Sequence, residues 1–217
     1  MLLEYKPPTE PYLDIVYQDE DILILNKPSG LLTVPGKAPE HKDSLDYRVR
    51  LVWPLARIVH RLDMATSGLV VMAMHAHSQR DLNRQFELRQ TSKRYFALLE
   101  GQVPVDCGAV DLPLLCDWPN RPKQMVHFAS GKPSLTYFKV LERTAQHTKV
   151  ELTPVTGRSH QLRVHMLWLG HPILGDKFYG TEQGKSSVAR LQLHAGSLRF
   201  RHPGSGTELY FEAECPF

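Results

Sequence analysis

Apolar positions along the chain predict more strands than helices. Residues 69–74 form the longest unbroken apolar segment and predict a strand buried on both faces. Segments 12–18 and 22–26 flank the acidic turn at 19–21 and predict a hairpin. Further strands are expected at 93–100, 135–140, 149–153, 191–200 and 208–211. Because most of these strands neighbour each other in sequence, we expect an α+β fold with a large mixed, mainly antiparallel β-sheet and flanking helices and loops.

Two helices are predicted in the first half of the chain. The first covers residues 44–53 and ends before Pro54, which cannot continue it. The second begins with Ser78 as N-cap and reaches about residue 89. Its inner face is expected to carry Leu82 and Phe86, one turn apart. Residues 101–132 contain seven prolines and glycines and are expected to be mostly loop.

A third helix is predicted from Ser159, as its N-cap, to Gly170, which suits the left-handed position after a helix. Its apolar stripe consists of Leu162, Met166 and Leu169. Arg163 borders this stripe. A buried arginine requires an acidic partner, and the alternative is a side chain whose head reaches water.

Bulk properties indicate a globular protein with a proper core. The chain has 217 residues, 42% of them hydrophobic, enough for one large domain or two small lobes. No segment approaches the roughly 18 apolar residues that span a bilayer. Residues 1–11 lack the pattern of a secretory signal. Three widely spaced cysteines suggest free thiols in a reducing compartment, so we expect a cytoplasmic protein.

The formal net charge is +3, and the basic residues gather in short clusters. These clusters are consistent with a polyanionic partner, while the alternative is a solvated surface of mixed charge. Their members are Arg80 and Arg84; Arg89, Lys93 and Arg94; Arg121 and Lys123; and Arg158 and Arg163.

Candidate chemistry centres on Asp63, in the segment His60-Arg61-Leu62-Asp63-Met64-Ala65-Thr66-Ser67-Gly68. An acid in a turn before a buried strand is a costly placement for a charge, which indicates function; the alternative is an acid that only caps the turn. Pairing with Arg163 would satisfy both charges and aim the carboxylate. Tyr95 follows three basic residues and could stack on a base, or could simply fill the core.

Several other motifs are excluded. The segment 60–63 has an extra residue relative to a kinase catalytic loop and lacks the other kinase motifs. Residues 180–186 miss the spacing of a phosphate-binding loop and are expected to be a flexible loop. His160 and His165 are five positions apart, which does not suit a zinc pair on a helix. We therefore expect no metal and no cofactor.

Four ordered motifs carry a family resemblance that covers the chain from about residue 15 to its end. Segments 26–31, 60–68, 93–101 and 157–165 together resemble the RluA family of pseudouridine synthases. Segment 116–124 resembles the branch of that family that acts on both 23S ribosomal RNA and the anticodon arm of transfer RNA. The resemblance implies one catalytic domain over residues 1–217, without an S4 domain, with the pseudouridine synthase fold and a central RNA-binding cleft.

The implied reaction isomerises a uridine in an RNA stem-loop to pseudouridine after base flipping. We expect a monomer. By the family's pattern Asp63 is the essential carboxylate, either a nucleophile toward the sugar or a base toward a glycal intermediate. Arg163 pairs with Asp63, Tyr95 packs on the uracil, and Arg61, with His60 beside it, enters the space the nucleotide leaves. The phosphate contacts are expected from Arg80, Arg84, Arg121 and Lys123.

Two other functions stay open. An RNA-binding module, such as a chaperone, could remodel RNA without turnover, and a hydrolase could free uracil. The presence of both Asp63 and Arg163 favours the isomerase over either alternative.

Overall fold

The computed structural model describes residues 5–217, so part of the prediction for the N-terminal segment, residues 1–4, lies outside the described residues. The chain divides into two compact units. The first consists of Met1–Ser92 and Ala195–Cys215, and the second of Lys93–His194 and Pro216–Phe217. Within the described residues, no helix is both long and apolar enough to cross a membrane.

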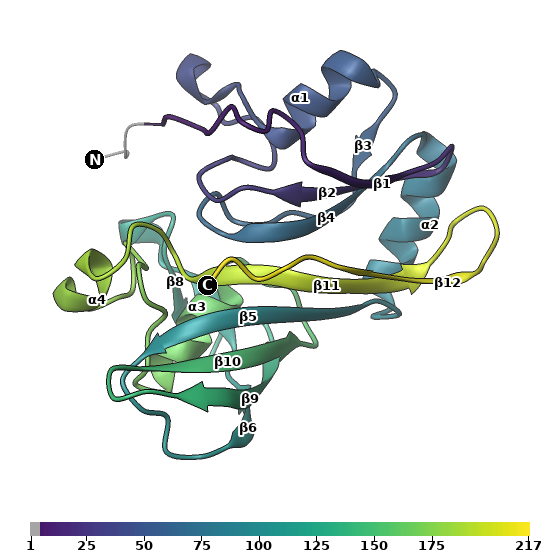
Figure 1. The fold of residues 1–217 in the computed structure, drawn as a ribbon. Coiled ribbons are helices and arrows are strands. Elements are labelled where there is room, and N and C mark those ends of the chain that lie inside the picture. Colours follow the sequence, from purple (N-terminus) through teal and green to yellow (C-terminus); the bar gives the residue numbers. More distant parts are fainter. Residues whose placement is uncertain (1–4) are drawn as a thin grey trace. The chain divides into compact units, whose positions relative to one another are not determined.

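The sheet of the first unit is built around a completely buried strand. β4 (Ser67–Ala73) has seven buried residues, which confirms the prediction from its apolar run. It lies antiparallel to β2 (Ile22–Lys27), which in turn pairs antiparallel with β1 (Ile15–Gln18) in the predicted hairpin (Figure 1). The short β3 (Arg57–Ile58) also pairs with β4.

The last strand pair completes this sheet as predicted. β11 (Leu193–Arg201), which enters the first unit at Ala195, neighbours β4 and is antiparallel to β12 (Glu208–Glu212). Side chains from β2, β4 and β11 form one buried cluster that includes Ile24, Val71 and Phe200. Leu82 and Phe86 pack in the same cluster, which confirms the predicted inner face of their helix.

The two longer helices of this unit differ in how well their starts were predicted. α1 (Leu45–Val52) lies within the predicted range 44–53, and Ser44 is its N-cap, whose side chain accepts a hydrogen bond from Tyr47 N–H (3.2 Å). α2 (Ala76–Glu87) instead starts after His75, so the prediction of Ser78 as N-cap was wrong. The hydroxyl of Ser78 donates to the carboxylate of Asp21, far away in sequence. A short 3-10 helix, η1 (Pro39–His41), precedes α1.

The second unit has a four-stranded antiparallel arrangement. β10 (His147–Pro154) pairs with β5 (Ser92–Glu100) on one side and β9 (Leu135–Arg143) on the other, and β6 (Cys107–Asp111) pairs with β9 (Figure 1). A separate hairpin is formed by β7 (Leu114–Cys116) and β8 (Gln124–Val126), with η2 (Trp118–Asn120) at its tip. The prediction that 101–132 is mostly loop therefore missed three short strands.

The helices of the second unit also correct two predictions. α3 (Gln161–Trp168) has His160, not Ser159, at its N-cap position, with a left-handed backbone (φ 53°). In place of a serine cap, the side-chain oxygen of Gln161 accepts from Arg158 N–H (3.0 Å). Gly170 has φ +82° after the helix, as predicted. Residues 180–186, expected to be a loop, contain the short helix α4 (Glu182–Ser186), capped by Thr181.

Strands dominate both units, and the strand pairs described above are antiparallel, so the α+β prediction is confirmed.

Candidate active site

A turn in the first unit presents Asp63. Hydrogen bonds between residues 27–33 and the residues on both sides of Asp63 fix this turn, and we call this set of contacts the grip. Thr33 Oγ1 donates to Leu62 O (2.7 Å) and accepts from Leu62 N–H (3.2 Å). On the other side, Ser29 Oγ donates to Ala65 O (2.7 Å) and Gly30 N–H to Met64 O (2.8 Å). The backbone at Asp63 is thus fixed from outside by residues about 30 positions earlier in the chain.

Lys27 is the most unusual member of this grip. Its side chain has no exposed surface, and its ammonium lies within hydrogen-bond distance of three carbonyl oxygens, of Pro28 (2.9 Å), Leu31 (2.7 Å) and Met64 (3.2 Å). An ammonium has three donors, so the three carbonyls match its capacity. A buried cation therefore connects the loop residues Pro28 and Leu31 to Met64, the residue after Asp63.

The turn itself closes locally and leads directly into the buried strand. Thr66 N–H donates to Asp63 O (3.1 Å), which fixes a tight turn over residues 63–66. At Gly68, φ is +114° and a Cβ would lie 2.4 Å from Ala195 O, so only glycine fits there. Asp63 is half-buried and is the first residue of this turn, which leads into β4.

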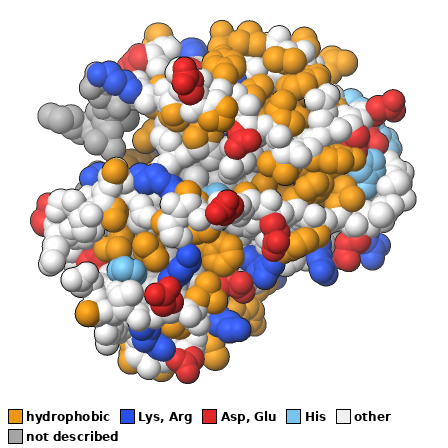
Figure 2. All heavy atoms as spheres, in the orientation of Figure 1, with side chains coloured by type: hydrophobic (Ala, Val, Ile, Leu, Met, Phe, Trp, Pro, Cys, Tyr) orange, Lys and Arg blue, Asp and Glu red, His pale blue; other side chains and the backbone are white. Residues whose placement is uncertain are grey.

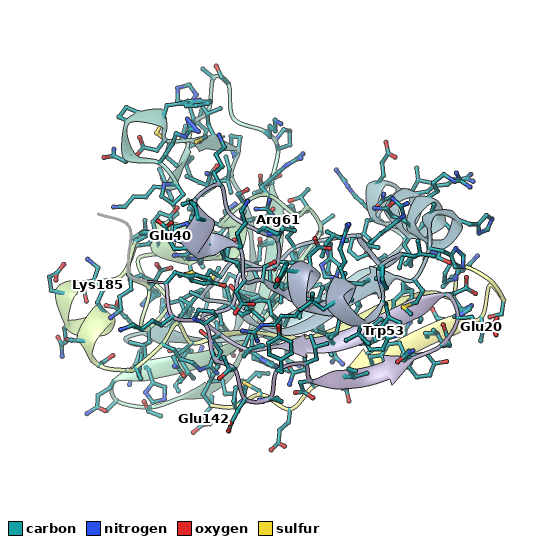
Figure 3. All side chains as sticks on the ribbon, turned by 90° about the horizontal axis from the view of Figure 1, so that it is seen from above. Glu20, Glu40, Trp53, Arg61, Glu142 and Lys185 are labelled. Carbon is teal, nitrogen blue, oxygen red and sulfur yellow. The ribbon has the colours of Figure 1, made fainter. Side chains whose placement is uncertain are left out.

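His60 and Arg61 precede the turn and have different surroundings. His60 Nε2 accepts a hydrogen bond from Val71 N–H (3.1 Å), and its ring stacks on Phe86 with centroids 4.8 Å apart. These contacts hold the ring against β4 and α2. Arg61, labelled in Figure 3, lies in the loop between β3 and β4 with an exposed side chain, where it can reach a ligand.

In the second unit Arg163 is deeply buried and firmly paired. Its side chain is 4% exposed, so the alternative in which its head reaches water was wrong. Its Nε and Nη2 donate to the two carboxylate oxygens of Asp176, each at 2.7 Å, in a bidentate ion pair. Asp176 Oδ1 also accepts from the backbone N–H groups of Phe178 (3.0 Å) and Tyr179 (3.2 Å), which fixes the acid in turn.

Aromatic rings complete the surroundings of Arg163. The guanidinium carbon lies 5.2 Å from the ring centroid of Phe178 and 5.1 Å from that of Tyr179, within the range of cation–π interactions. The Tyr179 hydroxyl is 2.7 Å from His160 Nδ1 and accepts from Gln124 N–H at 2.7 Å. Tyr179 therefore connects the start of α3 to the β7–β8 hairpin.

β5 supplies Tyr95 and a second candidate cation. Tyr95 is half-buried and lies opposite Leu152 of β10. Lys93 is two residues earlier, so its side chain points to the same face of the strand. Burial lowers the pKa of the Lys93 ammonium, because the charged form loses its hydration. The i, i+2 spacing of Lys93 and Tyr95 in the sequence already indicates that they share a face of the strand, although Lys93 was predicted only as part of a basic cluster.

A buried polar network supports the far side of α3. His165 is fully buried; its Nε2 lies 3.1 Å from Leu112 O and its Nδ1 lies 2.9 Å from Thr136 Oγ1. Because a carbonyl only accepts, Nε2 carries the proton, and Nδ1 accepts from the threonine. Burial lowers the pKa of His165, so the ring is neutral. Among the residues that the structure describes, no group of three or more His, Cys, Asp or Glu could hold a metal.

The basic residues expected to contact phosphate lie on both units. Arg80 and Arg84 are exposed on α2 of the first unit. Arg121 and Lys123 lie at the tip of the β7–β8 hairpin of the second, Arg121 exposed and Lys123 half-buried. On the face drawn in Figure 2, blue Lys and Arg side chains are interspersed with red Asp and Glu side chains.

The predicted site residues thus divide between the two units. Asp63, Arg61 and His60 belong to the first unit, and Tyr95 and Arg163 to the second. Their pairing across the units stays a prediction. Four supporting residues were not predicted from the sequence: Lys27, Thr33, Asp176 and Tyr179. Asp176 had a signal, since an acid after the apolar residues 172–174 needs a cation, and Arg163 was already known to need an acid.

Comparisons with known proteins define the class of protein that carries this site. The model of the family described as RNA pseudouridylate synthase matches residues 21–168. The solved structure of human RNA pseudouridylate synthase domain containing 1 has a TM-score of 0.81 and 31% identity, and the match covers 98% of this chain and 87% of that one. The fold and sequence are those of an isomerase that acts on uridines in RNA.

Bacterial relatives narrow this class. The chain is 52% identical to the dual-specificity RNA pseudouridine synthase RluA of Escherichia coli, over 98% of each chain. It is 54% identical to the protein of that name from Vibrio parahaemolyticus, over 94% of this chain and 84% of the relative, and 52% identical to that of Pasteurella multocida, over 100% and 99%. The chain belongs to the RNA pseudouridylate synthase family and is an RNA pseudouridine synthase.

Proposed function

We propose that this enzyme converts specific uridines in stem-loops of 23S ribosomal RNA and of the transfer RNA anticodon arm to pseudouridine, with Asp63 as the catalytic carboxylate. The observation that carries the proposal is the grip on Asp63: five hydrogen bonds between residues 27–33 and the neighbours Leu62, Met64 and Ala65 fix the backbone around it. A fold that fixes the neighbours of one half-buried acid in this way preorganises that acid for chemistry. Two RNA classes agree with the name of the dual-specificity relatives, and segment 116–124 supports these two through its resemblance to the branch that acts on both.

The reaction balances without any co-substrate. The N1–C1′ bond of uridine breaks, the uracil turns, and a C5–C1′ bond forms; the proton lost from C5 is balanced by the one gained at N1. The Asp63 carboxylate either attacks C1′ and leaves again, or removes a proton from the sugar to give a glycal. Neither route changes an oxidation state overall, which supports an enzyme without a metal or a cofactor.

The other site residues take roles that suit their surroundings. A uridine inside a stem must be extruded before Asp63 can reach its sugar, at a cost of a few kcal/mol. Exposed Arg61 enters the vacated space, next to His60, whose ring is already held by Phe86 and Val71. Tyr95 packs on the extruded uracil, and Arg163 holds the carboxylate of Asp63 by charge.

Phosphate contacts from Arg80, Arg84, Arg121 and Lys123 offset part of the cost of extrusion and make binding weaken with salt. Cys107, Cys116 and Cys215 form no disulfide, which supports a reducing compartment, and we place the enzyme in the cytoplasm as a monomer.

Tritium release from stem-loops that carry 5-tritiated uridine tests the proposal directly, since the C5 hydrogen leaves only when the isomerisation proceeds. We expect wild-type enzyme to release tritium from both a 23S and an anticodon-arm stem-loop. Asp63→Asn keeps the shape of the side chain but removes its charge, so we expect release to fall by at least about three orders of magnitude. Asp106→Asn is the control, because Asp106 has an 87% exposed side chain that only pairs with Arg143.

Each alternative function has its own outcome in this assay. Normal turnover by Asp63→Asn would remove Asp63 from the mechanism. Stem-loop binding and remodelling by the wild type without any tritium release would indicate an RNA-binding module. Free uracil together with an abasic site would indicate a hydrolase.

A further inference from the structure

The β7–β8 hairpin of the second unit ends in a compact tip formed by residues 117–123. Asp117 N–H donates to Lys123 O (3.0 Å), which closes the base of the tip. Asn120 N–H donates to Asp117 O (3.0 Å), and its side-chain amide donates to the Asp117 carboxylate (3.0 Å). The tip therefore has a defined shape, and the carboxylate of Asp117 is hydrogen-bonded within it.

Trp118 is the most prominent side chain of this tip. It is 65% exposed, although an indole gains most by burial. The guanidinium carbon of Arg121 lies over its ring, 4.2 Å from the ring centroid, so a cation backs the indole and limits its rotation. An oriented aromatic ring with this much open surface contributes nothing to the hydrophobic core and is available to a flat ligand.

The hairpin is anchored to the part of the unit that carries Arg163. Gln124, directly after the tip, donates its N–H to the Tyr179 hydroxyl (2.7 Å). Leu114 packs in a cluster with Val164 of α3 and Tyr179, and Val126 packs against this cluster. A ligand on the tip is therefore held at a set position relative to α3.

Charge favours RNA over a protein as the occupant. Residues 114–132 contain the basic side chains of Arg121, Lys123 and Lys132 and one acid, Asp117, which is engaged by Asn120. An aromatic ring beside basic groups is the arrangement with which proteins stack single-stranded bases while contacting the adjacent phosphates. RNA loops offer such unstacked bases, whereas a continuous duplex does not.

We propose that Trp118, backed by Arg121, is a stacking subsite for an unpaired base of the substrate RNA other than the uridine that is modified. This subsite rests on the proposed function, because the substrate must be an RNA with a loop. It selects stem-loops over duplexes by requiring a second accessible base at a set position from α3, and it tolerates several bases because each has a π-face.

Tryptophan fluorescence tests the stacking without depending on turnover. The chain has three tryptophans, so the double variant Trp53→Phe/Trp168→Phe keeps Trp118 as its sole indole. We expect its fluorescence to be quenched on titration with an anticodon-arm stem-loop and to change much less with a duplex of the same length. Binding of the stem-loop, seen by filter retention, without quenching would overturn the proposal.

Affinity measurements with Trp118→Ala give the second arm. Loss of one stacked base weakens binding at least about fivefold, so we expect Kd and KM for the stem-loop to rise by that factor or more while kcat changes less. Trp118→Phe should recover part of the affinity. Trp168→Ala is the control, as Trp168 is a 52% exposed tryptophan on α3.

The remaining outcomes separate this proposal from the proposed function. Equal affinity in wild type and Trp118→Ala would overturn the subsite and leave the tip as a contact for another protein, and equal losses in Trp118→Ala and Trp168→Ala would also overturn it. If the wild type bound and quenched with both stem-loops but released no tritium from either, the choice of substrates would fail while the subsite stood.

Discussion

The two units place their central charged residues in opposite ways. Around Asp63 the fold fixes the backbone: Lys27, Ser29, Gly30 and Thr33 bind the peptide groups of its neighbours. Around Arg163 the fold fixes the side chain itself, through two 2.7 Å bonds to Asp176 and two aromatic rings. The acid is half-buried, whereas the arginine and its partner are almost completely buried.

This difference separates activity from stability. If Asp63 loses its charge, Arg163 keeps both of its bonds to Asp176, so Asp63→Asn should affect chemistry and leave folding nearly unchanged. A buried ion pair behaves differently, because removal of one partner strands the other charge in a medium of low dielectric constant. On our proposal, the first unit presents its acid to react, and the second holds its arginine in one fixed orientation.

The largest effect on stability is expected from Asp176→Asn. It leaves the Arg163 guanidinium buried without the carboxylate that now binds its Nε and Nη2. We expect the free energy of unfolding to fall by about 3–5 kcal/mol, measured by urea denaturation. Tritium release should fall as well, because the guanidinium is no longer held in one orientation.

Asp63→Asn and Asp106→Asn complete this series. Both should unfold within about 1 kcal/mol of the wild type, the first without activity and the second with full activity. A loss of stability in Asp63→Asn as large as that in Asp176→Asn would end the distinction between the two units.

The next effect concerns the grip on the Asp63 turn. Lys27→Met keeps the apolar stem but removes the donors to three carbonyls, and a buried acceptor left without a donor costs about 1–3 kcal/mol. Met64 O still accepts from Gly30 N–H, so we expect the free energy of unfolding to fall by about 2 kcal/mol. We also expect a fall in kcat that exceeds the change in KM. Thr33→Val is the matched variant, because it removes both bonds to Leu62 and keeps the side-chain volume.

If the grip serves only to hold the fold, Lys27→Met and Thr33→Val would lose stability but keep kcat when it is measured on folded protein without denaturant. Loss of kcat in both, with KM nearly constant, would instead show that the backbone on each side of Asp63 must be fixed for turnover.

Sequence patterns predicted those elements whose signals are local. The buried residues 69–73 of β4 follow from one apolar run, and the end of α1 follows from the proline after Trp53. The start of α2 was missed because Ser78, a good cap by type, bonds to Asp21, while His75 accepts from Ser78 N–H (3.4 Å). The choice between two possible caps depends on a contact 57 positions away in sequence, which local propensity does not contain.

The site shows the same division. Residue types and family motifs predict Asp63, Arg163 and Tyr95 as site residues, but they did not predict the groups that hold these residues in place. Lys27 was in a recognised motif, yet nothing in the order Asn26-Lys27-Pro28 tells that its ammonium turns back to three carbonyls. The strands of 107–126 were missed because they are three to five residues long and separated by prolines.

The smallest effect is a pH dependence from His165. It tests the neutral network that supports α3 separately from the ion pair of Arg163. Burial lowers the pKa of this histidine below its ordinary value of 6.5, so the unfolded chain takes up a proton that the folded chain does not. The stability due to the neutral ring is complete above pH 6.5 and is lost as the pH falls below it, with a slope of at most about 1.4 kcal/mol per pH unit. We expect urea denaturation of His165→Gln to show a shallower slope than the wild type between pH 7 and pH 5, since glutamine can still donate to Leu112 O but does not titrate. Equal slopes would mean that the histidine accepts a proton in place, and that the neutral network of Thr136 and Leu112 does not hold α3 as its geometry indicates.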